Sequence, residues 1–221
     1  MTQAHIDMDR KILDKNDALA AANRALLQEK GVFVVNLLAS PGAGKTSTIM
    51  ATIAALRSRF QIAVIEGDIA SNVDAVKIKE EGIPAVQINT GGGCHLEADM
   101  LAKALDVLDL DALDLIIIEN VGNLVCPTDF YLGEDAKIMI LSVPEGHDKP
   151  LKYPGIFQAS EAIILNKVDT LPVFDFDMEA FEQSVSDLNP QAPIFRIAAT
   201  KGDGVQEWAD WLAQRIEQAQ G

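Results

Sequence analysis

Apolar residues occur along this chain in short, nearly continuous runs, and longer amphipathic stretches separate them. Runs without a polar face are typical of strands that are buried on both sides of a sheet. The pattern therefore predicts an α/β protein with a three-layer fold, in which helices flank a mainly parallel central sheet. The expected strands are Val32–Leu38, Ile62–Ile65, Ala85–Ile88, Leu115–Ile118, Lys137–Val143, Ala162–Leu165 and Ile194–Ile197.

Helical patterns lie between or after most of these runs. The first, from about Asp9 to Lys30, is loosely amphipathic, and Gly31 is well placed to end it. We therefore divide the chain into an N-terminal helical segment, residues 1–30, and one domain, residues 31–221. Further helices are expected near Thr46–Arg57, Ser71–Glu81, His95–Leu108, Met178–Leu188 and Val205–Gln220.

The composition limits the classes of partner. A chain of 221 residues suffices for one large domain with a substantial core. With 18 Lys and Arg against 33 Asp and Glu, the formal net charge is −15, which repels nucleic-acid phosphates and anionic lipids. No basic patch in the sequence offsets this charge, so we expect neither a nucleic acid nor a membrane as partner.

Two features of the sequence favour a cytoplasmic protein with free thiols. The charged residues Asp7, Asp9 and Arg10 interrupt the apolar centre that a secretory signal needs. The chain has only two cysteines, Cys94 and Cys126, so a disulfide framework is not indicated. These two thiols need a separate explanation.

A glycine-rich loop joins the first predicted strand to a helix. It reads Ala39-Ser40-Pro41-Gly42-Ala43-Gly44-Lys45-Thr46, and its backbone N–H groups converge with the helix N-terminus to form an anion site. Lys45 is suited to the β- and γ-phosphates of a nucleotide, and the Thr46 hydroxyl is suited to Mg²⁺. Position 39 has alanine where the strict pattern has glycine, but the context favours a P-loop over a plain turn. The expected nucleotide-binding residues here are Pro41, Gly42, Ala43, Gly44, Lys45, Thr46 and Ser47.

A second loop is suited to reading the base. Asn166-Lys167-Val168-Asp169 follows an apolar strand, and the Asp169 carboxylate can accept hydrogen bonds from the ring N–H and the amine of guanine. Asn166 can brace the loop and meet the ring nitrogen, while the stem of Lys167 covers the ring face. Alone, this tetrapeptide is equally suited to a solvated turn, but together with the P-loop it indicates GTP.

The loop Ala198-Ala199-Thr200-Lys201-Gly202 resembles the second guanine-contact loop of GTPases. In those proteins a backbone N–H group meets the base oxygen, and we assign that role to Ala199. Ala198 stands where serine is usual, so this is the weakest part of the base-reading prediction.

Two carboxylates at strand ends are candidates for the chemistry of the triphosphate. Asp68 and Glu119 could hold Mg²⁺ through water or orient the attacking water, although an ordinary loop carboxylate is the alternative for each. Gly122 is spaced to offer a backbone N–H group to the γ-phosphate. Together with Lys45, these two carboxylates are the predicted catalytic residues.

Cysteine and histidine also occur near these loops. Cys94 and His95 follow three glycines, and Cys126 lies seven residues beyond Glu119. These ligands suit Zn²⁺ or Ni²⁺, but one chain offers fewer of them than a closed structural site needs, so a symmetric dimer could complete the site. The alternative is that both cysteines are small buried hydrophobes. Because Cys126 follows the segment expected to sense the γ-phosphate, metal and nucleotide states would be linked.

Two segments carry a resemblance to a known family. Asn89–Ala98 and Ile118–Pro127 resemble the corresponding segments of HypB, the hydrogenase maturation GTPases of the SIMIBI class of P-loop proteins, and the likeness extends from about Asn16 to the C-terminus. The resemblance implies slow GTP hydrolysis, GTP-dependent homodimerisation, and a Zn²⁺ or Ni²⁺ site at the dimer interface built from Cys94, His95 and Cys126. It also implies work with a HypA-type nickel chaperone in delivering nickel to the large subunit of [NiFe]-hydrogenase.

Some features depart from the family pattern or leave alternatives open. Some members of the family carry an N-terminal Cys-rich metal motif or a His-rich stretch for nickel storage, whereas this N-terminus has only His5, so neither the high-affinity nor the storage role is expected. Lys149 and Lys152 lie in a further segment that resembles the family, and they could contact nucleotide or a second subunit. The rival hypotheses are a GTPase that matures urease or a cobalamin-dependent mutase, and a nucleotide-gated metal-binding module with incidental hydrolysis.

Overall fold

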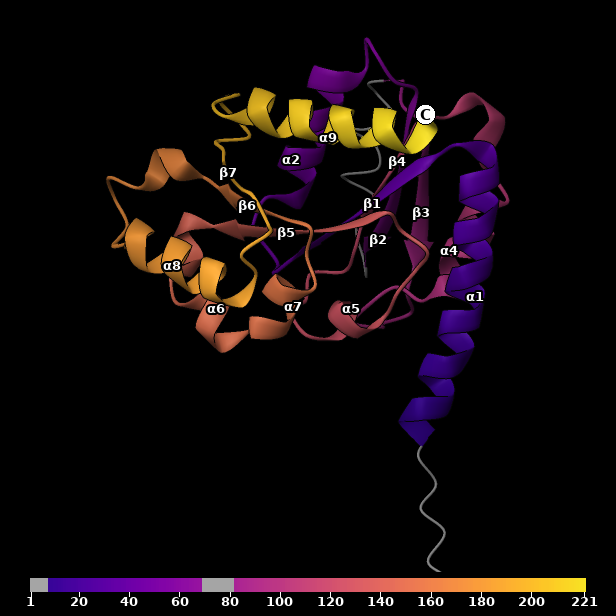
Figure 1. The fold of residues 1–221 in the computed structure, drawn as a ribbon, viewed down its shortest axis with the longest axis horizontal. Helices are drawn as coiled ribbons and strands as arrows, with labels where there is room; N and C mark the ends of the chain where they lie inside the picture. Colours follow the sequence, from indigo (N-terminus) through magenta and orange to yellow (C-terminus); the bar gives the residue numbers. More distant parts are fainter. Residues whose placement is uncertain (1–7, 69–81) are drawn as a thin grey trace, which may run out of the picture.

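The computed structural model describes residues 8–68 and 82–221, which form three layers around a central sheet (Figure 1). All seven predicted strands are confirmed, and every pairing between them is parallel. The strand order is β3-β2-β4-β1-β5-β6-β7, so β1 lies at the centre. The strands are β1 (Phe33–Ala39), β2 (Ile62–Asp68), β3 (Ala85–Asn89), β4 (Leu115–Glu119), β5 (Ala136–Ser142), β6 (Ala162–Asn166) and β7 (Ile194–Arg196).

The helices agree with most of the expected ones. The predictions near residues 9–30, 46–57, 178–188 and 205–220 are confirmed, and the one near residues 71–81 lies outside the described residues. The longer helices are α1 (Met8–Lys30), α2 (Lys45–Leu56), α4 (Ala98–Leu105), α8 (Met178–Leu188) and α9 (Val205–Gln220). Three short helices and three 3₁₀ turns were not predicted, because so few residues carry no periodicity: α5 (Cys126–Asp129), α6 (Lys149–Lys152), α7 (Pro154–Gln158), η1 (Leu110–Ala112), η2 (Val143–Glu145) and η3 (Val168–Thr170).

The helix expected at His95–Leu108 is shorter than predicted. It begins only at Ala98, because Glu97 is extended and the N–H group of Leu96 donates to the side chain of Asn120 at 3.2 Å. It ends at Leu105. Cys94 and His95 therefore lie in a loop rather than on a helix.

Helices cover both faces of the sheet. On one face, α2 and α9 pack on the alternate residues of the central strands that include Val35 and Ile117. Trp208 of α9 is buried there and donates to the Thr52 hydroxyl of α2 at 2.8 Å. On the other face, α1 and α4 cover β1, β2 and β4, while α7 and α8 cover β5 and β6 (Figure 1).

The parallel pairing brings the carboxyl ends of all these strands to one edge of the sheet, where ligands of such folds bind. The phosphate loop follows the central strand β1, and the loops after β3, β4, β6 and β7 carry other predicted motifs on either side of it. Within residues 8–68 and 82–221, no helix combines the length and apolarity needed to cross a bilayer.

The N-terminal helix α1 packs along α4 and joins the core. Its buried side chain Asn23 donates to the carbonyl groups of Ala98 at 2.8 Å and Leu132 at 3.0 Å. Gly133 comes so close to α1 that a Cβ atom there would lie 2.7 Å from the Ala20 carbonyl oxygen. Such contacts suit a helix that belongs to the fold, and the division at residue 30 stays a prediction.

Replacing Gly133 should therefore destabilise the protein more than replacing a glycine in open space. Gly133→Ala forces alanine into a left-handed conformation at φ 104° and against the backbone of α1. Gly31→Ala, the matched control, is strained only by its φ of 68°. We expect a loss of about 1–2 kcal/mol in the free energy of unfolding for the control and about 1–3 kcal/mol more for Gly133→Ala, measured by urea denaturation. Equal losses would mean that α1 is not held closely at this point.

Candidate functional site

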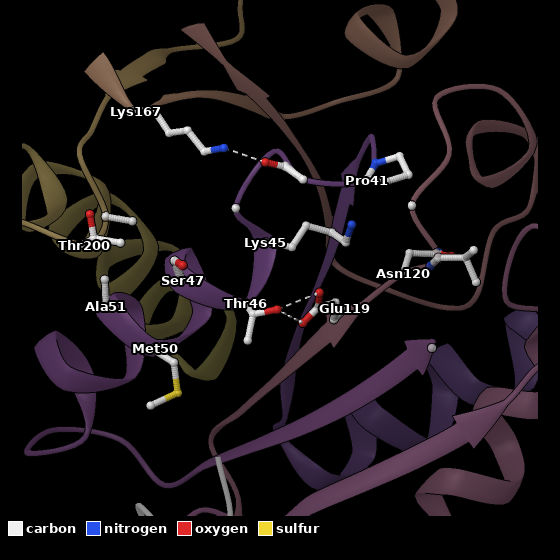
Figure 2. Close-up of a pocket in the computed structure, with 16 residues that line it drawn as sticks. Pro41, Lys45, Thr46, Ser47, Met50, Ala51, Glu119, Asn120, Lys167 and Thr200 are labelled. Carbon is white, nitrogen blue, oxygen red and sulfur yellow. Dashed lines mark hydrogen bonds between the residues drawn. The ribbon is translucent and has the colours of Figure 1, made fainter. Parts of the chain in front are cut away.

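A cavity of about 810 Å³ opens at the carboxyl edge of the sheet, at the N-terminus of α2 (Figure 2). Loops that are far apart in the sequence form its walls: the phosphate loop after β1, the loop after β4, and the loops after β6 and β7. It is lined by Pro41, Gly42, Gly44, Lys45, Thr46, Ser47, Met50, Ala51, Gly67, Glu119, Asn120, Val121, Gly122, Lys167, Ala199 and Thr200.

The structure thus brings together most of the predicted nucleotide-binding residues. Ten of the cavity-lining residues were predicted from the sequence, namely Pro41, Gly42, Gly44, Lys45, Thr46, Ser47, Glu119, Gly122, Lys167 and Ala199. Three further predicted residues, Ala43, Asn166 and Asp169, lie beside the cavity and are absent from its described lining. The side chain of Asp68, at the end of β2, lies outside the described residues.

The phosphate loop needs a glycine where it turns into α2. Gly44 has a φ of 97°, a left-handed conformation, and a Cβ atom there would collide with the side chain of Asn166. The loop then enters α2 at Lys45, so the positive end of the helix dipole lies at the cavity. Ser40 donates its hydroxyl to Glu145, whose other carboxylate oxygen accepts from Ser142, and this contact ties the loop to the end of β5.

Asn166 joins three loops at the base-reading side. It is 2% exposed, and its Nδ2 donates to the Ala43 carbonyl at 3.0 Å. Its Oδ1 accepts from the N–H groups of Lys167 at 2.8 Å and Ala199 at 3.2 Å. The side chain of Lys167 extends over the phosphate loop and donates to the Gly42 carbonyl at 2.6 Å (Figure 2). Asn166 therefore braces this loop, while its contact with the base stays a prediction.

Asp169 forms an ion pair with Lys201, with 3.0 Å between Oδ2 and Nζ. The Asp169 side chain is 22% exposed, so it is accessible to a ligand. The loop that carries Lys201 is closed by a backbone bond from Ala198 to the Asp203 carbonyl at 2.9 Å. A backbone closure of this kind does not need a serine side chain at position 198, so alanine there is compatible with the loop.

Thr46 and Glu119 face each other in the cavity wall (Figure 2). The Thr46 hydroxyl lies 3.2 and 3.3 Å from the two carboxylate oxygens of Glu119. A hydroxyl and a carboxylate are hard oxygen ligands, which fits Mg²⁺. Gly122 packs against the phosphate loop, since a Cβ atom there would lie 3.0 Å from the backbone nitrogen of Pro41.

Cys94 and His95, in the loop after β3, come together with Cys126, the first residue of α5. Their ligand atoms all lie within 4.8 Å of one another, and the Cys94 sulfur is 3.4 Å from His95 Nδ1. Cys94 is exposed and Cys126 is partly exposed, so the alternative that both are buried hydrophobes is wrong. His95 stacks on Phe130 with 3.8 Å between ring centres. This donor set suits Zn²⁺ or Ni²⁺.

The surroundings of this cluster shift two pKa values. The hydrogen bond with Cys126, followed by burial, raises the pKa of the Cys94 thiol. Burial lowers the pKa of His95, and the negative charge of Glu97 opposes this shift. An imidazole held neutral in this way has a lone pair for a metal ion. Its Nε2 is buried and makes no hydrogen bond within the described part of the chain.

Some site residues were missed by sequence reasoning. Met50 and Ala51 line the cavity from α2, and Asn120, Val121, Thr200 and Gly67 line it from the loops and β2. Asn120 directly follows Glu119 in a segment that was already predicted to belong to the site, so its place in the sequence could have indicated it.

Lys149 and Lys152 are absent from the described lining of the cavity, and Lys152 pairs with Asp148 at 2.5 Å. A role for either lysine in a subunit contact stays a prediction.

Comparison with known proteins agrees with this geometry. Residues 33–196 match the family model described as CobW/HypB/UreG, nucleotide-binding domain. The hydrogenase maturation factor HypB of Azotobacter vinelandii is 50% identical over 208 residues, which is 94% of this chain and 69% of that protein. The hydrogenase/urease maturation factor HypB of Helicobacter pylori (strain J99) is 39% identical over 219 residues, 97% of this chain and 90% of that protein.

A solved structure is similar over nearly the whole fold. The crystal structure of HypB from Helicobacter pylori in complex with nickel superposes with a TM-score of 0.88 at 38% sequence identity, covering 92% of this chain and 96% of that one. Sequence and structure therefore lead to the same conclusion. The chain belongs to the HypB hydrogenase maturation factors, within the CobW/HypB/UreG family of nucleotide-binding proteins.

Proposed function

We propose that this protein is a GTP hydrolase that couples its nucleotide cycle to nickel delivery during [NiFe]-hydrogenase maturation. The observation that carries the proposal is the pairing of two features at the carboxyl edge of the sheet. One is the cavity lined by Lys45 and Thr46. The other is the cluster of Cys94, His95 and Cys126. Membership of the HypB family supports the same activity.

In this proposal the loop from Pro41 to Ser47 holds the phosphates. Lys45 is the mobile charge, and Thr46 is the protein ligand of Mg²⁺, whose charge would neutralise the β- and γ-phosphates. Glu119, 3.2 Å from the Thr46 hydroxyl, orients the attacking water or holds a water bound to Mg²⁺. Asp68 shares that role from the end of β2. Catalysis is then electrostatic and positional, which suits a slow, regulatory GTPase.

Guanine recognition is assigned to the loops after β6 and β7. Asp169 accepts from the ring N–H and amine of the base, and the backbone N–H of Ala199 meets the base oxygen. Lys167 covers the ring face, and Asn166 holds both loops in place through its bonds to Lys167 and Ala199. Asp169 also pairs with Lys201, and a partly exposed ion pair of this kind costs little to rearrange.

The metal site is proposed to lie between two copies of the chain. Cys94, His95 and Cys126 supply three ligands from one chain, one fewer than the four that a closed zinc site takes, and Cys94 is exposed. A second chain would close the site symmetrically. GTP would favour this homodimer, because Gly122 is proposed to contact the γ-phosphate and Cys126 follows it on the same segment.

The partners follow from the family. We propose that a HypA-type nickel chaperone and the [NiFe]-hydrogenase large subunit act with this protein in the cytoplasm. The similar Helicobacter pylori structure contains nickel, which supports nickel over zinc as the delivered ion. Urease is a second candidate target, because the Helicobacter pylori relative is named for both enzymes.

Removing the Asp169 carboxylate should abolish the preference for guanine. Hydrogen bonds to a charged group contribute about 1.5–3 kcal/mol each. Asp169→Ala should therefore raise the Kd for GTP by at least about tenfold and leave the Kd for ATP unchanged. Isothermal titration with both nucleotides measures this. Asp175→Ala, an exposed carboxylate nearby in the chain, is the control and should keep the preference. The base assignment is lost if Asp169→Ala still discriminates against ATP.

Glu119→Gln should separate hydrolysis from binding. Loss of the carboxylate that handles water should lower kcat for GTP about 100-fold, while the GTP Kd changes less than about tenfold. Single-turnover hydrolysis and titration give the two numbers, and Glu179→Gln on the exposed side of α8 is the control. If Glu119→Gln still releases nickel as fast as the unmutated protein does with GTP, hydrolysis is incidental and the gated-module hypothesis is favoured.

Removing either cysteine should weaken metal binding. Cys94→Ala and Cys126→Ala should each lower Ni²⁺ and Zn²⁺ affinity by more than about 100-fold, since a lost ligand costs more than the roughly 10–100-fold of an outer-shell contact. Competition with a chromophoric chelator measures this, and His147→Ala is the control because His147 lies elsewhere, against Phe176. The expected stoichiometry is one ion per two chains. Unchanged affinities in both cysteine variants would exclude the site.

A further inference from the structure

One buried side chain connects the nucleotide cavity with the loop that carries Cys94 and His95. Asn120 lines the cavity directly after Glu119 and is 1% exposed. Its Oδ1 accepts two backbone hydrogen bonds, from Leu96 at 3.2 Å and from Val121 at 2.9 Å. A single amide oxygen therefore joins two segments that are 24 residues apart in the chain.

These two hydrogen bonds end on functionally different segments. Val121 lines the cavity and precedes Gly122. Leu96, which is fully buried, directly follows His95. A buried N–H group that loses its acceptor costs about 1–3 kcal/mol, so a displacement of either segment favours a matching displacement of Asn120. Another bond between these segments, from Asn123 Nδ2 to the Cys94 carbonyl at 3.3 Å, is exposed to solvent.

The orientation of the Asn120 amide is fixed by a chain of buried polar groups. Its Nδ2 donates to Asn36 Oδ1 at 3.1 Å, and Asn36 Nδ2 donates to Glu134 Oε1 at 3.2 Å. The second Glu134 oxygen accepts from the Leu132 N–H at 2.7 Å. Asn36 is fully buried on β1 and Glu134 is 3% exposed, so a flipped amide would place its oxygen against another acceptor.

The loop that carries Cys94 and His95 is also held at its C-terminal end, where it enters α4. The Ala98 N–H donates to Asn16 at 2.9 Å, and the Ala98 carbonyl accepts from Asn23 at 2.8 Å, both on α1. On the N-terminal side of Cys94, Gly91 and Gly92 have positive φ values, and nothing lies within 4 Å of the position that a Cβ atom would take at either one. If Leu96 is displaced, the backbone between Gly91 and Leu96 would therefore move rather than the start of α4, and this stretch contains Cys94 and His95.

We propose that Asn120 is a positioning residue that couples the nucleotide cavity to the Cys94–His95 loop. The proposal rests on the proposed function, in which the cavity holds GTP and the cluster holds a metal ion. When the γ-phosphate draws in the segment around Gly122, Asn120 shifts Leu96 and with it His95, while Cys126 moves with its own segment. Both halves of the metal site then respond to the same nucleotide.

The experiment compares metal affinity in two nucleotide states. The Zn²⁺ dissociation constant of the whole chain is measured with GDP and with a non-hydrolysable GTP analogue, in the unmutated protein, in Asn120→Ala and in Asn36→Ala. The unmutated protein should show a ratio of the two constants of about 5–150-fold, the usual size of such coupling. Asn120→Ala should bring the ratio close to one. Asn36→Ala removes one support of the Asn120 amide, but the N–H groups of Leu96 and Val121 still require its oxygen in the same place, so the ratio should be kept.

Each result has a distinct meaning. If Asn120→Ala keeps the ratio, or if both variants lose it together, Asn120 has no specific coupling role and the inference fails while the proposed function stands. If the unmutated protein already has a ratio of one, the proposed nucleotide–metal link fails, and this inference fails with it.

A measurement on the unmutated protein covers the case in which a variant does not fold. The backbone amide resonance of Leu96 is followed by ¹H–¹⁵N NMR as GDP is exchanged for the analogue in metal-free protein, with Leu212, buried in α9, as the reference. The Leu96 resonance should shift and that of Leu212 should not. A Leu96 resonance that is identical in both nucleotide states would overturn the proposal.

Discussion

The parallel pairing of β1 with both β4 and β5 is the constraint on which the rest of the structure depends. Because the strands run in one direction, every loop that follows a carboxyl end emerges at one edge of the sheet. The phosphate loop follows the central strand, so the loop after β4 lies on one side of it and the loops after β5 and β6 lie on the other. The cavity and the cysteine–histidine cluster are both products of this arrangement, since their residues come from loops at the same edge.

Buried amide side chains then hold these loops in register. Asn166 joins the phosphate loop to both base-side loops, and Asn120 joins the cavity to the segment behind His95. Asn23, on α1, donates to the carbonyl groups of Ala98 at the start of α4 and of Leu132, and so holds both against α1. Each is at most 5% exposed, and an unpaired amide at such depth would cost about 1–3 kcal/mol. Polar contacts of this kind specify one arrangement of loops, which apolar packing alone would leave less defined.

The seven strands and the main long helices could be predicted because each leaves a local pattern, a continuous apolar run for a strand and a helical periodicity for a helix. Strand runs such as Leu115–Ile118 are apolar throughout, and α8 and α9 were predicted with their observed bounds. The short helices α5 to α7 could not, since a single turn has no period. The late start of α4 was also hidden, because it depends on a hydrogen bond between Leu96 and Asn120, which lie far apart in the chain.

By itself, the sequence determined the fold class and the residue types that can bind a nucleotide and a soft metal. The reason is that each binding motif is a contiguous string with a chemistry of its own: the P-loop, the Asn166–Asp169 loop and the Cys94–His95 pair. Only the tertiary structure decided the strand order, the walls of the cavity, and the meeting of Cys126 with Cys94 and His95. The tertiary structure also decided which amide supports which loop. The physical reason is that such contacts join distant segments, and their geometry is set only when the sheet and its two helical layers have packed.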